Sequence, residues 1–327
     1  MTSMQHTLDA TPETIHWGFL DAALQPVLTI QSGDSISVIS VSGAREDLPT
    51  DERFYILDRH RAILDRVRPE LGPHILTGPV AINGAEPGDV LEVRIDDIEL
   101  IQNWGYNYTK PLRGVLPARF PERSKFHIGI DRATRSGHCP WGTRLPLRPF
   151  FGIMAVAPRP AYGRVSSVEP REYGGNIDNR ELIAGSRLYL PIFVPRALFS
   201  VGDGHGCQGD GEVNLTALET ALRGHLTLIL HKNRSLPLPR ATTSDHFMTM
   251  AFDPDLDDAA SAALNAMIDA ITACSSLNEA QAYALCSLAC SLRITQLVDG
   301  NKGVHAMLPR DVLSGVSETE FALGRPQ

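Results

Sequence analysis

The sequence predicts a mostly β protein, with a β-sandwich core followed by an α+β C-terminal portion. The chain has 327 residues, and 23 prolines and 27 glycines break it into short pieces, above all in its first two-thirds. The pieces alternate apolar and polar residues or carry β-branched side chains, which is typical of sandwiches and barrels. The last third instead contains alanine-rich segments with apolar residues at helical spacing, which predicts helices packed beside further strands.

The early strands are predicted from this alternation and from the turns that separate them. Gly33-Asp34, Asn83-Gly84 and Pro87-Gly88 are turn signals. Residues 57–67 have a helical pattern and interrupt the strands like an insertion. Strands are expected over residues 27–30, 35–41, 78–82 and 90–95.

Residues 101–150 show no clear periodicity. They contain Trp104, Tyr106, Tyr108 and Trp141 among many arginines and prolines. We expect a long irregular insertion here. Long loops in compact enzymes often wall a pocket, so this insertion is also a candidate pocket wall.

The last third predicts two helices and three strands. Residues 255–273 are rich in alanine, and Ser276-Leu-Asn-Glu279 is a capping box that opens a second helix over 280–291. Strands are expected over residues 224–230, 246–252 and 292–298. We therefore expect residues 1–223 to form the β-sandwich core with the active-site loops, and residues 224–327 to form an α+β portion packed on it.

The composition excludes several classes of partner. The net charge of −8 argues against nucleic acid and against an anionic membrane surface. No apolar run reaches the length of a membrane span, and the N-terminus lacks the pattern of a signal peptide. Five cysteines, an odd number without a disulfide spacing, suit a reducing compartment. We expect a cytoplasmic protein.

The segment from Val201 to Glu212 is the strongest candidate for a site. It holds five glycines, two aspartates, one histidine, one cysteine and one glutamate within twelve residues, and it follows an apolar run over 189–194. Glycine lets the backbone pass close to a ligand. Acids and a histidine carried on such a backbone are suited to binding a metal or moving protons.

Two pairs of polar residues suggest a divalent metal site. Asn176 and Asp178 are two residues apart, as are Asp203 and His205, so on extended strands each pair points to one side. Facing each other across a cleft, the pairs would suit Zn²⁺ with a bound water, and Glu212 could take and return a proton. In the plainest alternative the aspartates only cap turns; these are Asp178, Asp203 and Asp210.

Two other kinds of chemistry fit the same segment less well. Gly204 to Gly209 matches the G-x-G-x-x-G pattern of a dinucleotide site, with residues 214–223 as the helix, but the acids around it would repel a pyrophosphate. Cys207 could be a nucleophile with Glu212 as base and Lys232 as helper, although nearby acids would raise the pKa of its thiol.

Several motifs together resemble the acetamidase/formamidase family. Gly174-Gly-Asn-Ile-Asp178, Gly202-Asp-Gly-His205 and Gln208-Gly-Asp-Gly-Glu-Val213 carry the resemblance most specifically. Supporting motifs lie at residues 16–17, 74–79, 84–89, 189–191, 279–285 and 293–299. The chain departs from the family pattern at the isoleucine after His74, at Tyr173 and at Gly206-Cys207.

The resemblance implies hydrolysis of the C–N bond of a small linear amide, of the formamide or acetamide type, with release of ammonia. It also implies a homo-oligomer and a divalent metal, Zn²⁺ first and Ca²⁺ as the alternative. We expect the metal to be held by Asp178, Asp203 and His205. The expected catalytic residues are Glu212, Asp210 and His205, and the expected substrate-binding residues are Asn176, Gln208 and His74. The alternatives are an NADP-binding oxidoreductase and a β-sandwich binding protein without activity.

Overall fold

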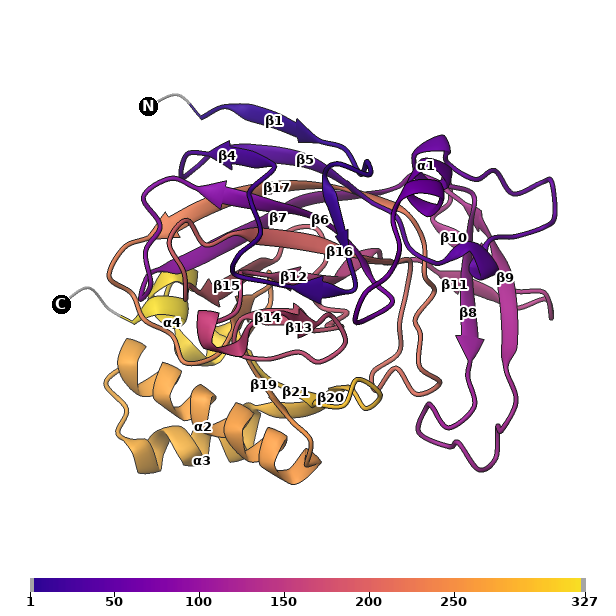
Figure 1. Ribbon diagram of the computed structural model, residues 1–327. Helices are drawn as coiled ribbons and strands as arrows, with labels where there is room; N and C mark the ends of the chain where they lie inside the picture. The colour runs from indigo at the N-terminus through magenta and orange to yellow at the C-terminus, as the bar shows by residue number, and fades with distance from the viewer. Residues whose placement is uncertain (1–2, 325–327) are drawn as a thin grey trace.

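The computed structural model describes residues 3–324, and its largest sheet has nine strands (Figure 1). In spatial order these are β1 (Gln5–Leu8), β5 (Ser35–Ser40), β17 (Leu222–His231), β7 (Val90–Leu100), β15 (Arg187–Pro191), β18 (Arg240–Thr242), β19 (His246–Asp253), β21 (Lys302–Pro309) and β20 (Ser291–Gln296). Neighbouring strands are antiparallel apart from the parallel pair β1–β5.

A second sheet covers one face of the first. Its order is β14 (Gly174–Asn176), β12 (Phe150–Ala155), β16 (Phe199–His205), β6 (Ile75–Ile82) and β2 (Ile15–Trp17), and β4 (Leu28–Ile30) also pairs with β6. β3 (Phe19–Leu20) and β13 (Val165–Ser166) form a small ladder beside it. Apolar side chains of both sheets, such as Ile36, Leu226 and Phe151, belong to one buried cluster. The β-sandwich core predicted from the sequence is confirmed.

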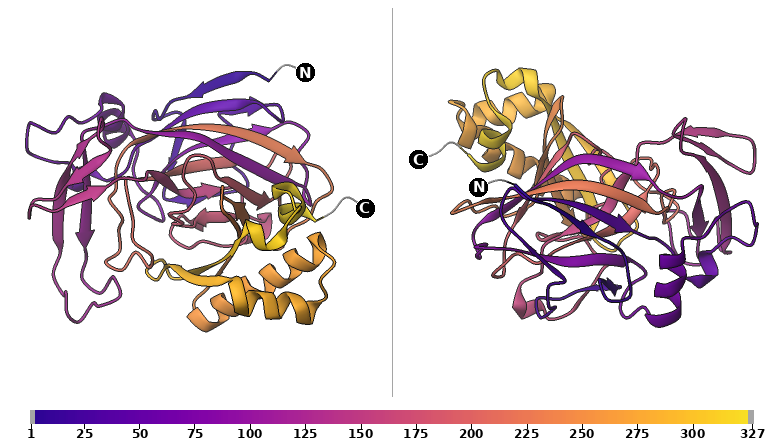
Figure 2. Two further views of the ribbon diagram at one scale, coloured as in Figure 1. Left: turned by 180° about the vertical axis from the view of Figure 1, so that it is seen from behind. Right: turned by 90° about the horizontal axis from the view of Figure 1, so that it is seen from above.

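Residues 101–150 form a sheet of their own, so the prediction of a long irregular insertion is wrong. The strands are β8 (Trp104–Thr109), β9 (Ser124–Asp131), β10 (Ser136–His138) and β11 (Arg144–Pro146), paired antiparallel in the order β11-β10-β9-β8. The sheet stands at one end of the molecule, away from both termini (Figures 1 and 2). The intervening loop, rich in arginine and proline, masks the alternation of β8 and β9 in the sequence. Tyr106 and Tyr108 stack with their ring centroids 5.8 Å apart.

The helices lie mainly at the C-terminal end of the chain. α2 (Leu256–Cys274) and α3 (Glu279–Ala289) pack together, α2 lies on β19 and β21, and α4 (Glu318–Leu323) contacts α2. The side chain of Asp255 caps α2 by accepting hydrogen bonds from the amides of Asp257 and Asp258. α1 (Asp58–Arg66) and three short 3-10 helices over 45–47, 160–162 and 310–313 complete the fold. No helix of the described chain is long and apolar enough to cross a membrane.

The elements expected from local patterns are confirmed. Helices lie at the three predicted ranges, 57–67, 255–273 and 280–291. The expected strands correspond to β4, β5, β6, β7, β17, β19 and β20. β17 crosses the boundary expected after residue 223, and the nine-stranded sheet joins strands from both sides of it. The division into a core and a C-terminal portion stays a prediction.

His16 on β2 is a buried polar link between strands of the second sheet. Its Nδ1 lies 2.7 Å from the carbonyl oxygen of Phe19, and its Nε2 lies 3.0 Å from Oγ of Ser200 on β16. A neutral ring with its proton on Nδ1 satisfies both contacts, since Nδ1–H donates to the carbonyl and Nε2 accepts from the hydroxyl. Burial lowers the pKa of His16 to about 4.

We expect His16 to make stability depend on pH between 6.5 and 4. Because the folded-state pKa lies below the ordinary value of 6.5, the unfolded chain binds the proton first. The contribution of His16 is therefore present above pH 6.5 and is lost as the pH falls through 4, by up to about 3 kcal/mol. Urea unfolding across this range should show a shallower pH dependence for His16→Gln than for the parent. The exposed His138, replaced by Gln, serves as control, and equal slopes for the parent and His16→Gln would refute the prediction.

Candidate active site

The polar residues of β14 and β16 meet over a glycine on the strand between them. β12 pairs with β14 on one side and with β16 on the other, and the amide of Asp178 donates to the carbonyl of Gly152 on β12 at 3.1 Å. A Cβ at Gly152 would lie 2.5 Å from Asp178 Oδ1, 2.5 Å from Asp203 Oδ2 and 2.8 Å from His205 Cε1. The missing side chain is what lets these three residues converge.

Three acidic residues of the site have left-handed backbone. The φ angles are 52° at Asp178, 56° at Asp203 and 44° at Glu212. Only a few per cent of non-glycine residues adopt such angles, and strain of this kind concentrates at functional sites. The sequence-based argument that both pairs lie on plain extended strands therefore needs correction: Asp178 follows β14, and Asp203 bends the backbone within β16.

His205 is the centre of the cluster. Its Nε2 lies 3.0 Å from Asp203 Oδ2 and 3.3 Å from Glu219 Oε1, and its Nδ1 lies 3.8 Å from Asp178 Oδ1. The ring is 1% exposed and meets Phe150 edge-on at 5.0 Å. Two carboxylates on one imidazole nitrogen, away from water, require a positive charge between them, either a proton or a cation.

Gln208 holds His205 in one orientation. Nδ1 of His205 lies 3.0 Å from Gln208 Oε1, while Gln208 Nε2 donates to the carbonyl of Asp178 at 2.8 Å. In this arrangement Nδ1 carries the proton, so the lone pair of the neutral ring is on Nε2. Gln208, expected to bind substrate, thus directs its carboxamide to His205 and to the backbone.

Glu219 joins the site although no sequence motif marked it. Residues 218–220 run antiparallel beside the end of β16, where Gly206 N donates to Leu218 O at 2.8 Å and Thr220 N donates to Gly204 O at 2.7 Å. This pairing sets Glu219 opposite His205. A lone acid close to a predicted strand was the only signal in the sequence.

Glu212 and Asp299 complete the acidic cluster from the C-terminal side. Ligand atoms of Asp178, His205 and Glu212 lie within 4.8 Å of one another, and Asp299 is 5% exposed. The loop that carries Glu212 is fastened to β20, because Gly211 N donates to Thr295 O at 3.0 Å. Asp299 ends a motif that supported the family resemblance, but the sequence assigned it no role.

Burial and neighbouring charges shift the pKa values of the residues in this cluster. Burial raises the pKa of Asp178 and Glu212 well above the ordinary values, and it raises the pKa of Glu219 and Asp299 to about 7. Burial also opposes the charged form of Asp203, but the neighbouring His205 and His74 outweigh it and lower the pKa of Asp203. Against its own burial, Glu219 and Asp203 raise the pKa of His205. Without a cation, the cluster retains protons at neutral pH.

The cluster also fits a divalent cation. Asn176 Oδ1, Asp178 Oδ1 and His205 Nε2 are buried and have no hydrogen-bond partner within residues 3–324. Asp203 is close to Nε2, but its direction does not suit a hydrogen bond from the ring. Carboxylate oxygens with one imidazole nitrogen are a ligand set that zinc accepts. Two overlapping groups could hold an ion, and both include His205: Asp178 with Glu212, and Asp203 with Glu219.

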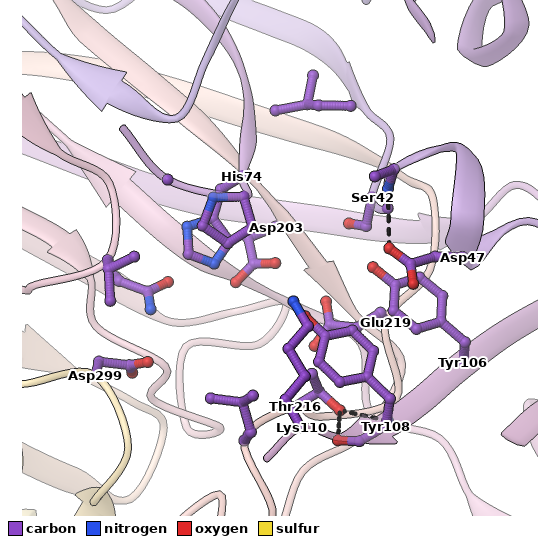
Figure 3. A pocket seen from close by; sticks show the side chains of 18 of the residues that line it. Ser42, Asp47, His74, Tyr106, Tyr108, Lys110, Asp203, Thr216, Glu219 and Asp299 are labelled. Atoms are coloured by element: carbon purple, nitrogen blue, oxygen red, sulfur yellow. Dashed lines mark hydrogen bonds between the residues drawn. The ribbon is translucent and has the colours of Figure 1, made fainter. Parts of the chain in front are cut away.

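A cavity of about 380 Å³ opens onto these residues (Figure 3). Asp203, Glu219 and Asp299 line its polar end. The side chains of Tyr106, Tyr108 and Lys110 enter from the four-stranded sheet, so residues expected to form a loose pocket wall do line the pocket, as an ordered hairpin. Size and mixed lining are those of a small-molecule site.

The remaining candidates from the sequence are placed as follows. Asn176 is 2% exposed, and His74 lies beside Asp203 with its Nδ1 2.9 Å from Ser167 Oγ; both line the cavity. Asp210, expected to be catalytic, lies outside the cavity and pairs with Arg293 at 2.5 Å. We do not carry Asp210 forward into the proposed site.

The structure does not support the two alternative sites, a dinucleotide site at Gly204–Gly209 and a nucleophile at Cys207. β16 runs through His205 and no helix follows between residues 206 and 221, so the glycine pattern does not open the helix that a dinucleotide site requires. Burial raises the pKa of Cys207 to about 11, which keeps its thiol protonated at neutral pH. Cys207 lines a different cavity, together with Cys139 and Trp141.

Comparison with known proteins gives the family. The model of the acetamidase/formamidase family matches residues 58–163 and 161–314, and the chain belongs to this family. It is 32% identical over 200 residues to a formamidase of Methylophilus methylotrophus, with 45% of this chain and 49% of that protein covered. It is 30% identical over 208 residues to an acetamidase of Mycolicibacterium smegmatis, with 44% and 50% covered. The chain spans about half the length of these curated relatives.

A solved structure supports the fold over nearly the whole chain. The acetamidase of Bacillus halodurans superposes with a TM-score of 0.82 at 28% identity, covering 95% of this chain and 99% of that one.

Gly152→Ala should damage the site without a change in any polar residue. The added methyl group would overlap Asp178, Asp203 and His205, so we expect activity on a small amide to fall about 10- to 100-fold, because small displacements of reacting groups are costly. Gly209→Ala is the matched control, since a Cβ there meets no atom within 4 Å. Ammonia release by the two variants decides the matter, and a Gly152→Ala enzyme as active as Gly209→Ala would refute the assigned role.

Proposed function

We propose that the protein is an amidase that hydrolyses the C–N bond of a small linear amide and releases ammonia. The observation that carries the proposal is the buried group of carboxylates around His205 at the end of an open cavity. Membership of the acetamidase/formamidase family supports the same reaction. Buried acids with displaced pKa values are typical of catalytic sites, which favours an enzyme over a pure binding protein.

We assign Asp178, Asp203 and His205 as ligands of a divalent cation, with Glu219 completing the set. When bound, the cation would supply Lewis acidity and a more acidic water at neutral pH. We favour zinc because the set includes an imidazole, with calcium as the alternative. Gln208 keeps the lone pair of His205 directed at the ligand position.

The other residues of the cluster bind the amide and move the proton. Asn176 carries a buried carboxamide on the cavity and can bind the amide group of the substrate. Burial raises the pKa of Glu212, so its ionised form is a stronger base, which can accept a proton from water and deliver it to the nitrogen as the C–N bond breaks. The amide and one water molecule are thereby converted into a carboxylic acid and ammonia. We also propose a cytoplasmic homo-oligomer.

Removal of single acids should abolish the reaction. We expect Asp203→Asn and Glu212→Gln each to lower kcat/KM for formamide or acetamide by at least about 100-fold, the scale of a lost proton-transfer group. The exposed Glu122, replaced by Gln, is the control. Ammonia release from a panel of amides is the measurement. If the parent hydrolyses no amide while fully loaded with metal, the protein is a binding module and the proposal is wrong.

Cation binding should stabilise the protein more at pH 8 than at pH 6. The pKa of Glu219 and of Asp299 is about 7 when folded and lower when unfolded, so their contribution to stability is present in acid and is lost as the pH rises through 7. A cation replaces the lost protons, whereas at pH 6 it must compete with them. At a hundredfold excess over Kd the gain is about 2.7 kcal/mol. Thermal unfolding with and without zinc tests this, and an equal shift at both pH values would contradict it.

A further inference from the structure

The cavity is larger than formamide or acetamide requires. Its volume is about 380 Å³. A water molecule takes about 30 Å³ of liquid, so an amide of four heavy atoms occupies on the order of 100 Å³. The acids of the cluster line one part of it, and the rest is lined by residues from 42–47 and 69–75 and by Tyr106, Tyr108, Lys110 and Arg113. The space beyond the amide group is available to a longer substrate.

Lys110 lines this cavity and can bind a second polar group of such a substrate. It follows β8 directly, is partly buried, and its Nζ lies 4.6 Å from the centroid of the Tyr108 ring (Figure 3). It forms no ion pair with any residue of the described chain. The ring holds the side chain along the wall of the cavity, while the ammonium keeps its hydrogen-bond donors for a ligand.

Other cations near the cavity are engaged or exposed. Asp47 in the wall pairs with Arg123 at 2.9 Å and with Lys125 at 3.7 Å, so these two basic residues are neutralised. Arg113 also lines the cavity, but it is exposed at the rim, where water weakens its attraction for an anion. Among the described basic residues that line the cavity, Lys110 is the more enclosed.

We propose that the enzyme prefers amides that carry a carboxylate at the end remote from the scissile bond, and that Lys110 binds this carboxylate. The inference rests on the proposed amidase function. A cation at His205 offsets the charge of the buried acids, and the carboxylate then meets a partly buried ammonium that forms no ion pair within residues 3–324. The substrate class is the monoamides of short dicarboxylic acids.

The first experiment compares substrates on the metal-loaded enzyme. Monoamides of two- to five-carbon dicarboxylic acids are measured against their neutral methyl esters and against acetamide by ammonia release. We expect kcat/KM to exceed that of the matching ester by about 10- to 100-fold at one preferred length, the range for a hydrogen-bonded charged group. Equal values for acid and ester at every length would overturn the inference. Hydrolysis of no amide would refute the amidase function itself, which is a different result.

The second experiment tests the residue. Lys110→Met should remove the preference for acid over ester, Lys110→Arg should retain most of it, and Lys110→Glu should reverse it toward amides that carry an ammonium group. Arg113→Met is the matched variant at the rim and should change the preference less than threefold. Thermal midpoints confirm that each variant is folded. If the preference survives Lys110→Met, or falls only with Arg113→Met, the assignment to Lys110 is wrong.

Discussion

The site depends on the electrostatic demand that buried acids place around one imidazole. His205 has a carboxylate oxygen at 3.0 Å and another at 3.3 Å from the same nitrogen, and it is almost wholly buried. Anions so close together cannot all stay charged away from water. Burial raises the pKa of Glu219 and Asp299 to about 7, so in the absence of a cation these side chains keep protons that reduce the repulsion in the cluster. A divalent ion would meet the same demand and put the charge to chemical use.

The sandwich serves this cluster by bringing three strands and two loops to one point. Gly152 on β12 has no side chain, and this leaves space for Asp178, which follows β14, to reach Asp203 and His205 on β16. Left-handed backbone at Asp178, Asp203 and Glu212 aims the carboxylates inward at a cost in strain. The strain is tolerated because the sheet fixes the chain on both sides.

Local patterns in the sequence predicted most elements and the centre of the site, while contacts between distant segments escaped them. Alternation and capping identified strands such as β5 and helices such as α2, because those signals are short-range. The segments 176–178 and 203–205 do meet, but through β12, and Gly152 is hidden in an apolar run where a glycine signals no turn. Glu219 is set opposite His205 by strand pairing, which no local motif announces. The four-stranded sheet was missed because its alternating strands flank a loop rich in proline and arginine.

The attachment of the active-site loop to β20 has a consequence for biosynthesis. Gly211 is bonded to Thr295, and Asp299 enters the cluster from the segment that follows. Thr295 and Asp299 are synthesised about ninety positions after the histidine of the cluster. A nascent chain therefore lacks a finished site until residues 295–299 have been synthesised and have joined the cluster.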